Sequence, residues 1–127
     1  MKDLYIVLEL PATTAEDFYV PVPCRGNVCS VKAVYDAIMD ADETVTVSRG
    51  ATAVNLVTPT EGVAAGTVIT GVPDTTNKGL IFDPDSATVV NQVLKLAVPA
   101  TVDSAGTMTI LVRFDDSGYV KQEPLEA

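Results

Sequence analysis

The clearest strand signal in the chain is the stretch Thr107-Met108-Thr109-Ile110-Leu111-Val112-Arg113-Phe114, which is rich in β-branched and apolar residues. It ends at Asp115-Asp116-Ser117-Gly118, whose small polar residues favour a turn. A second run, Thr44-Val45-Thr46-Val47-Ser48, alternates polar and apolar residues, the pattern of a strand buried on one face. Both runs predict β-structure, because Val and Thr suit a pleated surface.

Further strands are expected along the whole chain. Turn-forming residues separate the runs about every 8–12 residues, which is the spacing of a sandwich or a barrel. Pro21 interrupts one run, and we expect that strand at a sheet edge because proline cannot donate to a ladder. Residues 58–79, rich in Thr, Gly and Pro, are expected to form long loops with one short strand. The other strand candidates are residues 4–10, 18–22, 51–57, 67–70, 80–82, 87–90 and 93–98.

Residues 31–40 fit two periodicities. Val31, Val34 and Ile38 have helical spacing, whereas a period of two places Val31 and Ala33 on one face of a strand. We favour the strand, because the neighbouring segments are all predicted to be β.

Size and residue types limit the classes of function. The chain has 127 residues, enough for one domain, and its 47% hydrophobic content supports a packed core. It contains no histidine, which excludes Ser-His-Asp and Cys-His nucleophilic sites and the zinc sites that contain histidine. Two cysteines cannot form a four-thiolate zinc site.

Charge and hydropathy limit the partners. The net charge is −9, from 17 acidic and 8 basic residues, so we expect neither a nucleic acid nor an anionic membrane as a partner. No apolar run approaches the roughly 20 residues that a membrane span needs. Asp3 and Glu9 interrupt the apolar N-terminal stretch, so we expect a protein made in the cytoplasm without a secretory signal.

Cys24 and Cys29 bracket a Gly26-Asn27 pair, which suits a tight turn. If that turn forms, the two cysteines face each other across a hairpin, at the Cα separation of about 5.5 Å that a disulfide requires. The alternative is a pair of reduced thiols packed as small apolar side chains, as expected in a reducing cytosol.

Acidic residues cluster at three places. Adjacent carboxylates can bind calcium, and a carboxylate pair can hydrolyse glycosides, but none of these clusters has the spacing of an EF-hand loop. Aspartate is common in turns for local hydrogen-bonding reasons. We therefore expect solvated turns with no catalytic residue, cofactor or metal, and a weak calcium site is the alternative. The clusters are Asp40, Asp42 and Glu43; Asp83 and Asp85; and Asp115 and Asp116.

Two apolar stretches are candidates for contacts with a partner. In the N-terminal stretch both faces are apolar, and such a strand is an aggregation hazard if it stays uncovered at a sheet edge. We expect it to pack on another molecule; the alternative is an ordinary strand in its own sheet. Residues 80–82 form either a buried strand or an exposed patch. The candidate contact residues are Leu4, Tyr5, Ile6, Leu8, Leu80, Ile81 and Phe82.

The order of several segments from Phe18 onward resembles a known family. This order is similar to that of small jelly-roll proteins that decorate the assembled heads of tailed bacteriophages, also called cement or capsid-stabilising proteins. The cysteines and the strand at residues 4–10 have no clear counterpart in the family pattern. The segments are Val20-Pro21-Val22-Pro23-Cys24, Val31-Lys32-Ala33-Val34-Tyr35, Ala41-Asp42-Glu43-Thr44-Val45-Thr46-Val47, Gly50-Ala51-Thr52-Ala53-Val54, Ala64-Ala65-Gly66, Val93-Leu94-Lys95-Leu96 and Ala105-Gly106-Thr107-Met108-Thr109-Ile110.

The resemblance implies a protein that binds the outer surface of the virion's capsid as a homotrimer, with the major capsid protein as its partner and without enzymatic activity. The expected fold is a single all-β domain over residues 1–127, a two-sheet sandwich of jelly-roll type. Residues 1–10 are expected to be an N-terminal arm or strand, and residues 121–127 a polar acidic tail. The alternative function is a receptor- or glycan-binding module of a phage fibre or tail.

Overall fold

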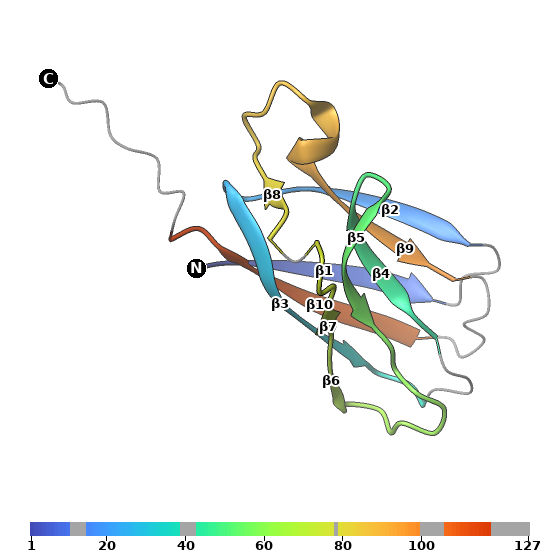
Figure 1. Ribbon diagram of the computed structural model, residues 1–127. Helices are drawn as coiled ribbons and strands as arrows, with labels where there is room; N and C mark the ends of the chain where they lie inside the picture. Colours follow the sequence, from blue (N-terminus) through green and yellow to red (C-terminus); the bar gives the residue numbers. More distant parts are fainter. Residues whose placement is uncertain (11–14, 39–42, 78, 100–105, 118–127) are drawn as a thin grey trace, which may run out of the picture.

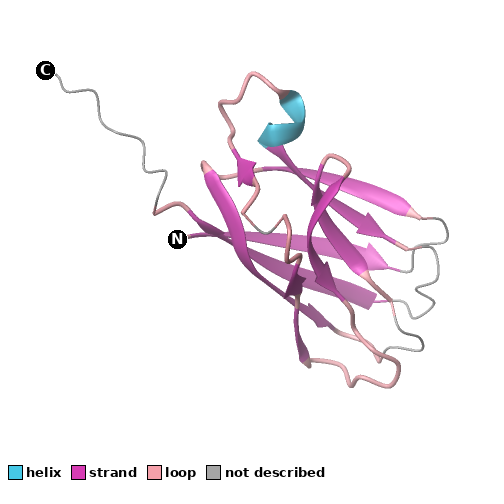
Figure 2. Cartoon of the chain, in the orientation of Figure 1, coloured by secondary structure: helices cyan, strands magenta, loops and turns pink. Residues whose placement is uncertain are grey.

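The computed structural model describes residues 1–10, 15–38, 43–77, 79–99 and 106–117, and the regular secondary structure of this part of the chain is almost entirely β-strand (Figure 2). A single turn of 3-10 helix, η1 (Val89–Gln92), is the one helical element in the described ranges. The strands are β1 (Lys2–Leu10), β2 (Glu16–Pro21), β3 (Gly26–Tyr35), β4 (Val45–Arg49), β5 (Thr52–Val57), β6 (Val68–Thr70), β7 (Val72–Pro73), β8 (Ile81–Phe82), β9 (Val93–Val98) and β10 (Gly106–Asp115).

The strands form two antiparallel sheets that pack face to face (Figure 1). Sheet A has the order β1-β10-β3-β6, with β8 also pairing with β3, and sheet B has the order β2-β9-β4-β5-β7. Four of the pairings are nested along the chain: β1 with β10, β2 with β9, β3 with β6, and β4 with β5. The predicted all-β sandwich is therefore confirmed.

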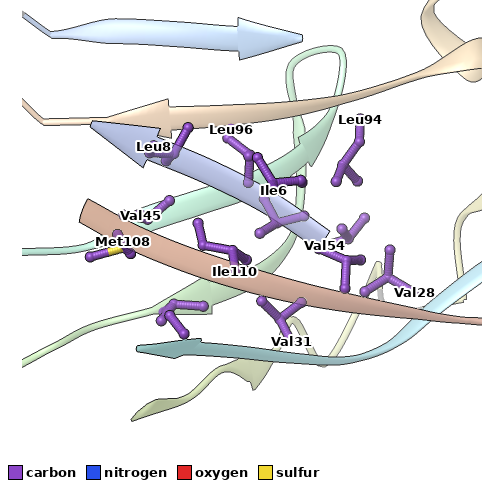
Figure 3. Close-up of a cluster of buried hydrophobic side chains, with 14 of the residues drawn as sticks. Ile6, Leu8, Val28, Val31, Val45, Val54, Leu94, Leu96, Met108 and Ile110 are labelled. Carbon is purple, nitrogen blue, oxygen red and sulfur yellow. The ribbon is translucent and has the colours of Figure 1, made fainter. Parts of the chain in front are cut away.

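The core lies between the two sheets and is built from alternate residues of each strand. In β10, Met108, Ile110 and Val112 are fully or almost fully buried, while the residues between them point away from the core. Figure 3 shows side chains of sheet A, such as Ile6 and Ile110, meeting those of sheet B in this space. Each fully buried side chain of this size stabilises the fold by roughly 1.5–3 kcal/mol relative to an exposed one.

Most of the strand predictions are confirmed. Residues 107–114, the clearest strand signal in the sequence, lie in β10. Residues 31–35 belong to β3, so the helical alternative for that segment is wrong. Pro21 ends β2, which is an edge strand of sheet B as expected from its missing N–H. Residues 39–42 and the predicted tail at residues 121–127 lie outside the described residues.

The strand predicted at residues 87–90 is wrong, because the segment leads into η1 instead. Local hydrogen bonds explain the difference. The Ser86 Oγ accepts from the Thr88 N–H at 3.1 Å and from the Asn91 side chain at 3.3 Å, and the Asn91 N–H donates to the Thr88 carbonyl at 3.0 Å. These bonds close a turn despite the β-branched residues.

The short strand predicted at residues 67–70 is confirmed as β6, and a second short strand, β7, follows it. β6 extends sheet A beside β3, and β7 extends sheet B beside β5, so this segment joins the two sheets. The connection is anchored by the N–H of Gly71, which donates to the Val31 carbonyl at 2.7 Å. Gly71 is buried against Asn55, where a Cβ would clash with the amide oxygen.

Candidate interaction surface

The N-terminal strand is an ordinary member of its own sheet. β1 pairs with β10 along its whole length, from Lys2 opposite Phe114 to Leu10 opposite Gly106. Ile6 and Leu8 are buried in the core, and Leu4 packs against it. Ile6 and Leu8 therefore offer almost no surface to a partner, and Leu4 is half-buried. Tyr5 points the other way and is 67% exposed, so it remains a candidate contact.

The stretch Leu80-Ile81-Phe82 also belongs to the fold. Phe82 has no exposed surface and meets Phe114 edge to face, with ring centroids 5.8 Å apart. Leu80 and Ile81 are half-buried, and the Ile81 carbonyl accepts a 2.6 Å hydrogen bond from the Arg49 guanidinium. Of the two alternatives for residues 80–82, the structure shows the buried strand. Phe82 is therefore a core residue and not a contact residue.

Cys24 and Cys29 are both free thiols in this structure. The predicted tight turn is absent, because Gly26 and Asn27 belong to β3 and pair with Phe82 and Ile81. Cys29 lies at a bulge in β3, and its Sγ is 3.6 Å from the Met1 Sδ. Burial raises the pKa of both thiols, which favours their protonated, unreactive form.

Cys29 also borders an open hollow of about 400 Å³. The described lining residues bear no charge and no base that could activate the thiol. They are Asn27, Val28, Cys29, Pro73 and Gly79.

The acidic clusters are used in turns and ion pairs. Asp83 accepts a hydrogen bond from the Asp85 N–H at 2.9 Å, and the Asp115 Oδ1 accepts from the Ser117 hydroxyl at 2.6 Å. The latter hydrogen bond lowers the pKa of Asp115. Among the described residues, no group of three or more acidic or thiol side chains could hold a metal ion. Asp40 and Asp42 lie outside those residues.

The outer face of sheet A carries apolar side chains on four neighbouring strands, with Thr109 and Lys32 between some of them. We call this set the outer band: Tyr5, Val7, Val34, Val68 and Leu111. Directly opposed residues of antiparallel strands point to the same side of a sheet. One row therefore runs across four strands as Val7, Thr109, Val34 and Val68, and the next row as Tyr5, Leu111, Lys32 and Thr70.

Three members of the outer band are well exposed, namely Tyr5 at 67%, Val7 at 62% and Val68 at 55%. Val34 and Leu111 are half-buried between them. The strands that carry the band, β1, β10, β3 and β6, are hydrogen-bonded neighbours in sheet A (Figure 1). The outer band is therefore a candidate interaction surface.

Charged residues border the outer band. The Arg113 guanidinium donates to both carboxylate oxygens of Asp3, at 2.8 and 3.1 Å. This hydrogen-bonded pair lowers the pKa of Asp3 and raises that of Arg113. The strands also place Lys32, Glu9 and Asp115 on this face, so its strand residues carry three acidic groups against two basic ones.

The outer face of sheet B is more polar. Lys95 pairs with Asp17 at 3.5 Å, and Thr46 lies in the same row as Asp17. Exposed apolar side chains adjoin each other at the far edge of this sheet, where Leu56 faces Val72. Sheet A therefore presents the broader apolar surface.

The predicted contact residues included Tyr5 but not the other members of the outer band, which are Val7, Val34, Val68 and Leu111. Each of these strands has only isolated apolar residues on its outward face, and isolated exposed apolar residues are common on protein surfaces. The strand register brings these residues together, and the residue pattern of any one strand does not specify that register.

Among the described residues, no helix is long and apolar enough to span a membrane. Comparison of the chain with family models, curated proteins and solved structures finds no match.

Proposed function

We propose that this chain is a capsid decoration protein of a tailed bacteriophage. It binds the outer surface of the head, with the major capsid protein as its partner, and stabilises the shell as a homotrimer. The protein acts by binding, without catalysis. It is made in the cytoplasm of the host bacterium and becomes part of the virion.

The proposal includes a jelly-roll fold, and the nested strand pairs support it. A jelly roll contains eight strands in two sheets, arranged as two Greek keys. The orders β1-β10-β3-β6 and β2-β9-β4-β5 contain eight strands whose four nested pairs alternate between the sheets. β7 and β8 are two-residue additions at the margins. The segments that carry the resemblance to decoration proteins include parts of β3, β4, β9 and β10.

The outer band is the observation that carries the functional proposal. A protein that acts by binding to a shell and to its own neighbours needs an accessible apolar surface, and the outer band provides one across four strands. The acidic charge is compatible with this role, because a protein on the outside of a head does not contact the packaged DNA.

The proposal is tested by co-sedimentation of the purified chain with expanded heads of the phage that encodes it. We expect saturable binding in a fixed ratio to the major capsid protein, and no pelleting of the chain when heads are omitted. A chain that stays in the supernatant at saturating concentration contradicts the proposal. Binding to host cells or glycans without binding to heads would favour the alternative, a receptor- or glycan-binding module.

A further inference from the structure

We draw no further inference here: the strongest candidate, the outer band on the outward face of sheet A, is an unpartnered apolar surface, and nothing in the structure shows what covers it.

Discussion

Replacing Phe82 by alanine tests whether residues 80–82 are part of the core or a surface for a partner. Phe82 has no exposed surface and contacts Phe114 edge to face. Removing a buried phenylalanine side chain costs about 3–5 kcal/mol. A chain of 127 residues has an unfolding entropy of about 270 cal/mol/K, so this loss should lower the melting temperature by roughly 11–19 °C. A domain of ordinary stability remains folded after such a loss in most of the expected range.

The measurement is urea denaturation at neutral pH, combined with thermal unfolding. Tyr19→Ala, at an aromatic residue that is 62% exposed on β2, is the control, and we expect it to cost less than about 1 kcal/mol. A double-mutant cycle with Phe82→Leu and Phe114→Leu should show a coupling of about 0.5–1.5 kcal/mol from the ring contact. If Phe82→Ala costs less than about 1 kcal/mol, Phe82 is not the core residue that the structure describes.

Two further predictions concern the backbone and the pH dependence. Gly26→Ala should destabilise the fold by about 1–3 kcal/mol in urea denaturation, because its Cβ would lie 2.5 Å from the Asp115 carbonyl oxygen. Gly79→Ala, where a Cβ meets no atom within 4 Å, should leave stability unchanged, and equal effects of the two would contradict this explanation. The carboxyl of Asp3 should titrate below its ordinary pKa of 3.8 by NMR, because Arg113 hydrogen-bonds to its charged form. The contribution of this ion pair to stability is present above pH 3.8 and is lost as the pH falls through the lower folded-state pKa of Asp3. Arg113→Gln should return the titration midpoint of Asp3 toward 3.8. An unchanged midpoint would argue against the pair.

The strands that depend on local pattern could be predicted from the sequence. The alternation at Thr44-Val45-Thr46-Val47-Ser48 and the apolar run of residues 107–114 place side chains on opposite faces at every second position, which is a property of the strand itself. The edge position of β2 also followed from one residue, Pro21.

Features that depend on contacts between distant residues could not be predicted in this way. Gly26-Asn27 has the composition of a turn, but pairing with Ile81 and Phe82 keeps it extended. A close approach of the Asp115 carbonyl explains why glycine occurs at position 26. Tertiary pairing thus overrides the local preference, as it commonly does for short segments.

The candidate surface was only partly predictable for the same reason. The alternation in residues 2–10 correctly separates Tyr5 from Ile6 and Leu8, but it does not say which side faces the core. Assigning the outer band requires the strand order of sheet A. β10 lies between β1 and β3, and this order brings Leu111 beside Tyr5.

The most direct test of the proposed function is the copy number of this chain in purified virions, measured by quantitative mass spectrometry against the major capsid protein. A decoration protein should be present in a fixed ratio to the major capsid protein, and antibodies should reach it on the heads of intact particles. Absence from the virion, or a copy number that follows the tail proteins rather than the capsid protein, would contradict the proposal.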